Sequence, residues 1–584
     1  MPSRHCLTST APSPFGFCIQ MHWQEHVVSA VFAAGLATWF AFVAKEVPAP
    51  YLDEFFHVPQ AQKYCAGDYT WDPKITTPPG LYLVAKLFSP LFGCSTTALR
   101  AQNVLALCFI LTRLFKIRKA IYLPCYVQRI KKGAVDKLDG STPNTQTDAI
   151  EDAQTPFSAA LTAFNIASFP PLYFFGALYY TDVMSTAAVL MSYEVFLASA
   201  TKQQRTFSDD VLAIISGIVA LFFRQTNIFW VAVFPAGLTV VRMLGKNGRM
   251  KSSAAKDGHL AILKESWSRS VIYDCSLQDS GLAISDSILF VLTTAIAALS
   301  SPLKVVRSVV AYVFLLVLFA GFVVWNGSVV LGDKSAHTAT IHTPQMLYIW
   351  PYIALFSAPI LLGPLYRCLA NLLPSSINGK TETTQKSHSS IYPHPVQAAV
   401  FISAGLLAVH FNTIIHPYTL ADNRHYVFYV FRLLLRHPVL KYLAVPVYYA
   451  CFWLSIQSLA HPTTNPVTPP PTVHSKPHQI STTPTQSPVQ ISFVIIWLVT
   501  TSLSVVTAPL VEPRYFIIPW IIWRLYVPHA PTAFTLKGRA YAPDLRVAVE
   551  AVWVSAINQT LQYLFLHKTF TWPSEPGNKQ RFLW

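Results

Sequence analysis

The sequence is short of charged residues. Only 12% of its 584 residues are Asp, Glu, Lys or Arg, against about 25% in a typical soluble chain. Acidic residues are the scarcer kind, with 27 Asp and Glu against 43 Lys and Arg. Hydrophobic residues reach 52% and the mean hydropathy is +0.39. A chain of this length with so few charges cannot cover a water-facing surface, so an ordinary soluble fold is excluded.

Several functional signatures are missing as well. The chain has no P-loop, no GxGxxG, no HExxH and no DxD motif. Its nine cysteines show neither CxxC nor zinc-site spacing. The histidines His57, His337, His416 and His425 are scattered, as is typical of structural residues. We therefore predict no metal site and no cofactor.

Long uncharged runs are present instead. Residues 26–44, 308–332 and 345–366 carry no charge, and each reaches the roughly 20 residues that cross a bilayer core of about 30 Å. No strand-like alternation appears, and a helix satisfies its own backbone groups in lipid. The first run is longer than the usual 7–15-residue core of a signal peptide, which favours a retained span over cleavage. The predicted fold class is an all-α polytopic membrane protein.

Basic residues gather between the apolar runs and account for the net charge of +16. One cluster lies in 113–137 and another in 242–269. Such clusters are typical of cytoplasmic loops, and we prefer this interpretation to a nucleic-acid surface. With the clusters cytoplasmic, span 27–46 runs outward and residues 47–100 form an extracytoplasmic loop.

The remaining spans follow by alternation, and we expect twelve to fourteen in all. Residues 283–303 are apolar but contain Asp286, so they either span or lie along the interface, which leaves the side of the C-terminus open. The other spans are expected near 101–122, 157–178, 183–200, 209–223, 227–244, 308–331, 345–368, 395–413, 438–459, 490–511, 514–529 and 545–566.

Two polar segments, 137–155 and 461–488, lack core-forming residues and are predicted to be disordered cytoplasmic inserts. Cys65 and Cys94 share the extracytoplasmic loop. Two alternatives stand for them, a disulfide and a pair of buried thiols.

The polar residues that remain fall on the extracytoplasmic side of this topology. Charges at membrane depth cost several kcal/mol and are usually paired or functional, so these short turns favour a single site over unrelated loops. They lie at 51–57, 71–74, 179–182, 222–227, 326–337, 414–432 and 511–516.

Acids, cations and aromatic rings occur together in these turns. A carboxylate can act as a general base for a sugar hydroxyl. Arginine binds phosphate through charged hydrogen bonds, and a cation can neutralise a departing phosphate. This set indicates glycosyl transfer from a lipid phosphate.

Six motifs carry a family resemblance: YLDEFFHVPQAQKYC, WDPKITTPPGLYL, FFRQTNIFWV, GDKSAH, HPYTLADNRHYVFYVFR and QRFLW. Together they resemble the α-1,2-glucosyltransferases of the endoplasmic reticulum (ER) membrane that add the last glucose to the dolichyl-diphosphate-linked oligosaccharide. The resemblance implies a GT-C fold with a lumenal active site and short interfacial helices in the first lumenal loop. It also implies dolichyl phosphate glucose as donor, the diglucosylated high-mannose lipid-linked glycan as acceptor, and inversion at the anomeric carbon.

In this family the first lumenal loop presents an acid to the acceptor, and here Asp53 and Glu54 occupy that place. Adjacent residues on a helix point about 100° apart, so we expect one acid to face the substrate while the other holds a cation or caps the helix. We predict that Asp53 is the base, with Glu54 as the alternative. A helix-capping role for both is the competing interpretation.

Other roles follow from the same turns. For the donor phosphate we predict Arg424 first, then Arg514 and Arg224, then Lys74 and Lys334, with His425 as a further donor. Asp72 either holds the acceptor or forms an Asx turn, and Asp182 is expected to cap a helix. The predicted acceptor- or sugar-binding residues are His57, Trp71, Asp72, Asn423 and Tyr426.

Two other classes compete with an enzyme. A transporter or scramblase places charges near the bilayer midplane, often in repeats, whereas these charges lie at span ends and no repeat appears. A scaffold subunit needs no cluster of acids and cations. The donor already carries a phosphate leaving group, so we expect transfer to be independent of metal.

Overall fold

The structure is a computed structural model. It describes residues 23–138, 157–202, 204–250, 258–280, 282–334, 340–370, 393–460, 488–508, 510–530, 534–536, 539–541 and 544–584. The predicted insert 461–488 lies outside these residues apart from its last position, and 137–155 lies outside apart from its first two.

Most of the described chain is helical, as predicted. The first half holds α1 (Trp23–Glu46), α2 (Glu54–Ala66), α3 (Gly80–Phe92), α4 (Thr96–Leu138), a helix over Phe157–Ala167, α6 (Pro170–Phe175), α7 (Thr181–Ala200), α8 (Phe207–Leu221), η1 (Gln225–Asn227), η2 (Phe229–Val233), α9 (Phe234–Gly245), α10 (His259–Arg269), α11 (Leu277–Ser280) and α12 (Ile284–Ser300). The second half holds α13 (Pro302–Asn326), α14 (Gln345–Phe356), α15 (Ala358–Ala370), α17 (Pro395–Asn412), α18 (Pro417–Ala421), α19 (Tyr426–Leu434), α20 (Leu440–Gln457), α21 (Ile491–Val505), η5 (Pro513–Phe516), α22 (Ile517–Tyr526) and α23 (Leu545–His567).

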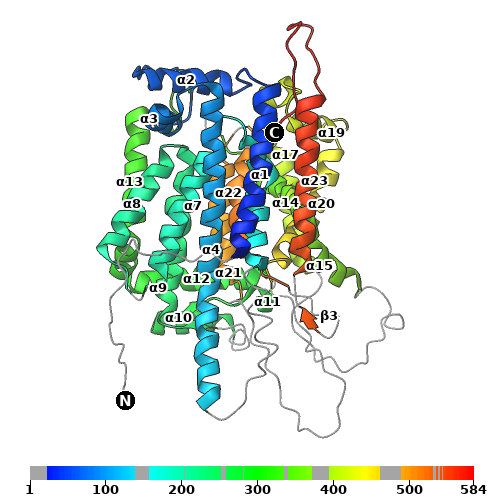
Figure 1. Cartoon of the computed structure of the whole chain (residues 1–584). Helices are drawn as coiled ribbons and strands as arrows, with labels where there is room; N and C mark the ends of the chain where they lie inside the picture. Colours follow the sequence, from blue (N-terminus) through cyan, green and yellow to red (C-terminus); the bar gives the residue numbers. More distant parts are fainter. Residues whose placement is uncertain are drawn as a thin grey trace.

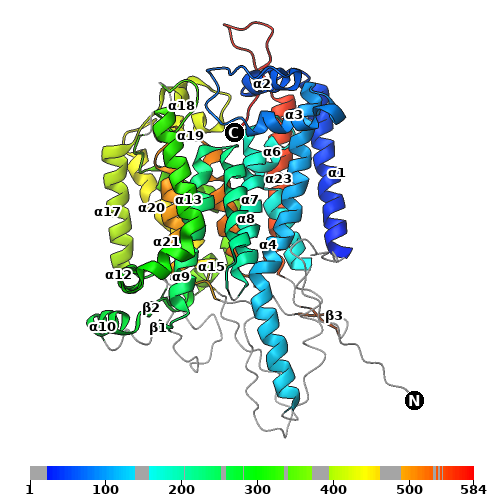
Figure 2. The ribbon, with the colours of Figure 1, turned by 90° about the vertical axis from the view of Figure 1, so that its left-hand side faces the viewer.

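Strands are few and short. Strand β1 (Arg249–Met250) pairs in parallel with β2 (Ile272–Tyr273), and β3 (Phe534–Leu536) pairs antiparallel with β4 (Arg539–Tyr541). The long helices stand side by side as a bundle, while α2 and α3 lie across one end (Figure 1). Helices α18 and α19 lie at that same end, called the α2 end below, and α10 with β1 and β2 lies at the opposite end (Figure 2).

Five described helices are long and apolar enough to cross a membrane, or six if the bent pair α14–α15 counts as one span. Other helices of the bundle are shorter or carry charge. Within α23, for example, Glu550 accepts hydrogen bonds from Nε and Nη2 of Arg524 in α22 (2.7 and 2.5 Å), and both side chains are buried. Pairing of this kind makes charges tolerable inside a bundle. The count of twelve to fourteen spans stays a prediction.

The stretch 345–368, which we predicted as one span, is bent in the structure. Helices α14 and α15 meet at Ser357 with a bend of 95°. Pro359 explains the break, because proline has no N–H to donate to the carbonyl four residues earlier. That carbonyl, on Leu355, instead accepts a hydrogen bond from Trp553 Nε1 of α23 (2.8 Å).

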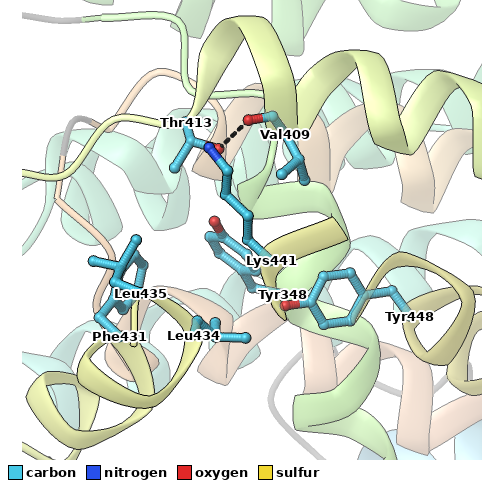
Figure 3. A pocket seen from close by; sticks show the side chains of 8 residues that line it. All are labelled: Tyr348, Val409, Thr413, Phe431, Leu434, Leu435, Lys441 and Tyr448. Atoms are coloured by element: carbon cyan, nitrogen blue, oxygen red, sulfur yellow. Dashed lines mark hydrogen bonds between the residues drawn. The ribbon is translucent and has the colours of Figure 1, made fainter. Parts of the chain in front are cut away.

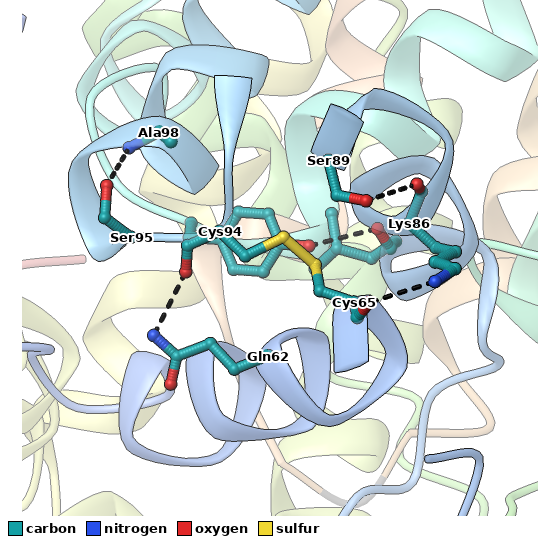
Figure 4. Close-up of a disulfide and its surroundings, with 9 residues drawn as sticks. Gln62, Cys65, Lys86, Ser89, Cys94, Ser95 and Ala98 are labelled. Carbon is teal, nitrogen blue, oxygen red and sulfur yellow. Dashed lines mark hydrogen bonds between the residues drawn. A yellow bond between two sulfur atoms is a disulfide. The ribbon is translucent and has the colours of Figure 1, made fainter. Parts of the chain in front are cut away.

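Helices α2 and α3 pack against each other and form a small hydrophobic cluster apart from the main core. Gly67 ends α2 in a left-handed conformation (φ 86°), which glycine adopts without a Cβ clash. Cys65 and Cys94 form a disulfide across this unit (Figure 4). Of the two alternatives left open by the sequence, the structure therefore has the disulfide.

Candidate active site

A cavity of about 230 Å³ opens at the α2 end of the molecule. Four chain segments that are far apart in the sequence surround it: the turn before α2, the α18–α19 region, the turn before η5 and the C-terminal residues. Its lining residues are Asp53, Tyr418, Thr419, Ala421, Asp422, His425, Val427, Leu510, Val511, Glu512, Pro513, Arg514 and Trp584.

Asp53 is the acid of the first loop that faces this cavity. Leu52 before it adopts a left-handed conformation (φ 53°), which is rare for a side chain of this size, and the chain turns sharply into α2. The Asp53 side chain stays 40% exposed, and its Oδ2 accepts a hydrogen bond from Arg514 Nη1 (2.9 Å). Asp53 stands at the N-cap position of α2 but makes no side-chain capping bond. The carboxylate is thus presented to the cavity rather than used by the helix.

The charge of Asp53 is fixed by its neighbours. Burial acts to raise the pKa of Asp53, but the attraction of Arg514 and its hydrogen bond hold that pKa below its usual range. The carboxylate is therefore ionised at neutral pH and available to accept a proton.

Arg514 is surrounded by three carboxylates. Besides Asp53, it contacts Glu512 through Nη2 (2.8 Å) and lies 3.6 Å from Asp182 Oδ2. Its guanidinium also lies over the ring of Tyr180. Asp182 in turn pairs with Arg224 (2.9 Å) and is 3% exposed.

Asp182 does not cap a helix as we predicted. Helix α7 begins at Thr181, with Tyr180 at the N-cap position. Asp182 instead joins Arg224 and Arg514, which belong to two different turns. The prediction failed because a carboxylate in the first turn of a helix suits either role, and its partners lie elsewhere in the sequence.

Glu54 lies away from the cavity and is completely buried. Arg100 of α4 donates to it from Nε and Nη2 (2.8 and 2.6 Å), and the main-chain N–H groups of Tyr51 and Tyr179 donate as well (2.9 and 2.6 Å). Four donors thus occupy its two oxygens. Of the two adjacent acids, Glu54 is buried with Arg100, and Asp53 faces the cavity, where it pairs with Arg514.

His57 follows Asp53 by one helical turn. Its Nδ1 hydrogen-bonds with the hydroxyl of Tyr82 (2.7 Å). Burial lowers the pKa of His57 to about 4, although the charge of Asp53 acts in the opposite direction. His57 is therefore neutral at physiological pH.

Asp422 and His425 also line the cavity, whereas Arg424, predicted first for the donor phosphate, is not a lining residue. Arg424 donates to both oxygens of Asp422, through Nε (2.9 Å) and Nη2 (2.7 Å), and lies over the ring of Trp572. Burial opposes the ionisation of Asp422, but its hydrogen bonds from Arg424 lower its pKa. His425 lies 3.7 Å from Asp422 through Nε2 and donates from Nδ1 to the main-chain oxygen of Trp584 (2.7 Å).

The neighbours of this group are held by the chain itself. Asn423 accepts a hydrogen bond from Trp572 Nε1 (2.9 Å). The ring of Tyr426 packs against Trp584 (5.2 Å between centroids). Neither is a lining residue, although both lie beside His425.

Four other predicted site residues are not among the lining residues. Trp71 donates to the carbonyl of Ile75 (3.2 Å), and Asp72 accepts from the main-chain N–H of Lys74 (2.9 Å), which is the Asx turn considered above. The amino group of Lys74 lies over the ring of Phe56 (5.9 Å). Lys334 donates to the carbonyl of Asn326. The structure thus collects Asp53, Arg514 and His425 at the cavity but not these four.

Sequence reasoning gave no role to Glu512 and Trp584, which line the cavity. Both lie in stretches that we had singled out, VEPRYF and QRFLW, yet nothing in either stretch says which part of the chain it meets. Only the fold brings them beside Asp53 and His425.

A second cavity, of about 10 Å³, lies between α14, α17, α19 and α20 (Figure 3). Lys441 points across it toward Thr413, among largely apolar neighbours such as Phe431 and Leu434. It has room for about one water molecule and is too small for a sugar. Within the described ranges, no three His, Cys, Asp or Glu side chains are grouped to hold a metal ion.

The sequence matches the model of the DIE2/ALG10 family over residues 47–525. It is 37% identical to a protein of Emericella nidulans across 94% of this chain and 96% of that protein. It is also 30% identical to a protein of Mus musculus across 97% of this chain and 99% of that one. Both relatives are named Dol-P-Glc:Glc(2)Man(9)GlcNAc(2)-PP-Dol alpha-1,2-glucosyltransferase. No solved structure matches the chain. The resemblance predicted from the six motifs is confirmed, and the chain belongs to the DIE2/ALG10 family.

Proposed function

We propose that this protein transfers glucose from dolichyl phosphate glucose to the Glc(2)Man(9)GlcNAc(2) oligosaccharide on dolichyl diphosphate, forming the terminal α-1,2 linkage. The proposal rests on sequence similarity. Two relatives that are both named for this activity match at least 94% of the chain. The helical bundle, with its polar cavity at one end, suits two substrates that are both anchored in lipid. We place the protein in the ER membrane with the α2 end in the lumen, and we assign it to the GT-C fold.

In the proposed reaction Asp53 is the general base. Its carboxylate accepts the proton of the acceptor hydroxyl as that oxygen bonds to the anomeric carbon of the donor glucose. The bond from this carbon to the phosphate oxygen breaks in the same step, and dolichyl phosphate leaves. One displacement inverts the anomeric centre, so a β-linked donor forms an α-linked product.

Arg514 orients the base in this proposal. Three carboxylates already share its charge, which leaves it poorly suited to bind a further anion. It holds Asp53 in place, and Arg224 reaches the same network through Asp182.

The donor phosphate is assigned to the opposite side of the cavity, beside His425 and Arg424. Among the described residues, Arg424 forms a salt bridge with one carboxylate, that of Asp422, and a more distant one, Glu575, also attracts it. Arg514 has three carboxylates within 4 Å, so the side of Arg424 is the more favourable one for an anion. Neutralising the phosphate as it departs lowers the barrier to transfer. Independence from metal stays a prediction drawn from the leaving group.

The test is glucose transfer by purified protein in detergent, with dolichyl phosphate glucose and a synthetic lipid-linked acceptor. We expect Asp53→Asn to lower kcat by about a thousandfold, because an amide cannot accept the proton. Asp72→Asn is the matched control, since Asp72 is an acid of the same loop that forms a turn away from the cavity. Wild-type protein that transfers no glucose would contradict the proposed function. Equal rates for Asp53→Asn and wild type would remove only the assignment of the base.

The transporter alternative is not favoured. A transporter would place charges near the bilayer midplane, whereas the residues that line the cavity come from turns at the α2 end of the bundle. Uptake of labelled dolichyl phosphate glucose into vesicles, without transfer to an acceptor, is what that alternative would require.

A further inference from the structure

The last described residues of the chain run along the wall of the cavity. We call residues Gln580–Trp584 the C-terminal strap. Within it, Trp584 lines the cavity, while Gln580 and Leu583 are 3% and 0% exposed.

One side of the C-terminal strap is tied to the turn that carries Asp53. The hydroxyl of Tyr51 accepts a hydrogen bond from the main-chain N–H of Arg581 (2.7 Å) and donates to the carbonyl of the same residue (3.0 Å). Tyr51 is buried and stands two positions before Asp53. A single hydroxyl therefore fixes the strap to the start of the acid-bearing turn.

The other side of the strap is tied to the segment that carries Arg424 and His425. The N–H of Leu583 donates to the carbonyl of Arg424 (3.0 Å), and the N–H of Tyr426 donates to the carbonyl of Leu583 (3.1 Å). His425 Nδ1 donates to the main-chain oxygen of Trp584 (2.7 Å). These bonds set both the backbone around His425 and the direction of its ring.

The side chain of Arg581 anchors the strap to the bundle. It is 6% exposed and donates to the carbonyls of Phe565 and Leu566 at the end of α23 and to that of Glu46 at the end of α1 (2.7, 2.9 and 3.1 Å). Carbonyls at helix C-terminal ends lack helical partners and favour a cation. The strap therefore has a fixed position relative to two long helices.

We infer that the C-terminal strap is a positioning element of the active site, which holds the Asp53 turn and the Arg424–His425 segment at the separation that the reaction needs. The inference rests on the proposed function, because it assigns the base and the phosphate contact to these two sides. Displacing reacting groups by about 1 Å can slow a reaction about a hundredfold, so a loosened strap slows transfer although no catalytic group is lost.

The first test is Tyr51→Phe, which removes the hydroxyl and keeps the ring. We expect kcat to fall about tenfold while KM for the donor changes less than about twofold, because misplacement acts on the chemical step. Tyr193→Phe is the matched control, since it removes a hydroxyl bonded to that of Tyr526 (2.6 Å) within the bundle. All rates are measured well below the thermal midpoint of each variant. A Tyr51→Phe variant that has a lower Tm but wild-type kcat would make the strap merely structural and overturn the inference.

The second test changes the strap itself. Deleting residues 580–584 should reduce kcat more than Tyr51→Phe does. Phe582→Leu keeps the main chain of the strap at a residue that packs on Phe570 and does not line the cavity, so it should retain most of kcat. Wild-type kcat in the deletion variant would also overturn the inference. If the deletion variant does not fold, the kcat of Tyr51→Phe tests the inference by itself.

A readout without catalysis separates this inference from the proposed function. Phe55 and Tyr418 are each 60% exposed, on α2 and α18. Nitroxide labels at these positions, attached by a chemistry that spares native thiols, report the distance across the cavity. We expect a narrow distance distribution in wild type and a broader one in Tyr51→Phe. Unchanged distributions would contradict the strap's role even if wild-type protein transfers no glucose.

Discussion

At the scale of single residues, two adjacent acids have separate environments. Glu54 is buried with Arg100, and Asp53 faces the cavity. Breaking one partner of a buried pair costs about 3–5 kcal/mol. Glu54→Gln should therefore lower the Tm and the yield of folded protein, whereas Asp53→Asn should lower activity with little change in Tm. Thermal unfolding of both purified variants checks this, and a lower Tm for Asp53→Asn than for Glu54→Gln would contradict it.

We expect the stability of the fold to depend on pH through His57. Its pKa is about 4 in the fold, against an ordinary value of 6.5. The unfolded chain binds a proton here first, so acid favours unfolding and stability falls as the pH drops from about 6.5 to 4. His57→Gln should make the fall of Tm over this range shallower. Identical slopes for variant and wild type would show that His57 is not the group responsible.

Part of this residue-scale arrangement could be read from the sequence, and part could not. The pair Asp53–Glu54 stands out because acids are scarce, and a helical spacing predicts that the two point apart. Which of them faces the cavity depends on Arg100, a residue 46 positions away. No local pattern links Glu54 to that cation, so only the fold separates the two roles.

At the scale of elements, the disulfide Cys65–Cys94 holds the end of α2 to the segment after α3. It closes a loop of 29 residues, for which the loss of unfolded-state entropy stabilises the fold by about 3–4 kcal/mol. We expect Cys65→Ser to lower the Tm, and Cys451→Ser, which removes a free thiol, to leave it nearly unchanged. A Tm for Cys65→Ser equal to that of wild type would contradict this contribution.

The boundary between α14 and α15 could not be predicted from the sequence. The run 345–366 has no charge, so its composition predicts one span. The bend at Ser357 follows from Pro359 together with Trp553, which lies 198 positions from the carbonyl that it satisfies. The proline can be seen in the sequence, but the partner of the freed carbonyl cannot, because Trp553 lies in a distant helix.

At the scale of the whole molecule, the two ends of the bundle should lie on opposite sides of the membrane. Phe55 on α2 is 60% exposed, and Leu260 on α10 is 83% exposed. In sealed ER vesicles, Leu260→Cys should react with an impermeant maleimide, and Phe55→Cys only after detergent opens the vesicles. Unmutated protein gives the background from native thiols. Labelling of Phe55→Cys in sealed vesicles would place the cavity in the cytosol and end the proposed mechanism.

The hydrogen bonds between Tyr51 and Arg581 join positions 530 residues apart. A ribosome adding about 5–20 residues per second needs roughly 30 to 100 s to cover that distance. Throughout that time the hydroxyl of Tyr51 lacks its partner Arg581, and the part of the cavity lining that Trp584 supplies has not been made. A ribosome that stalls before Arg581 therefore leaves a chain in which the turn that carries Asp53 lacks the hydrogen bonds that the strap would make to Tyr51.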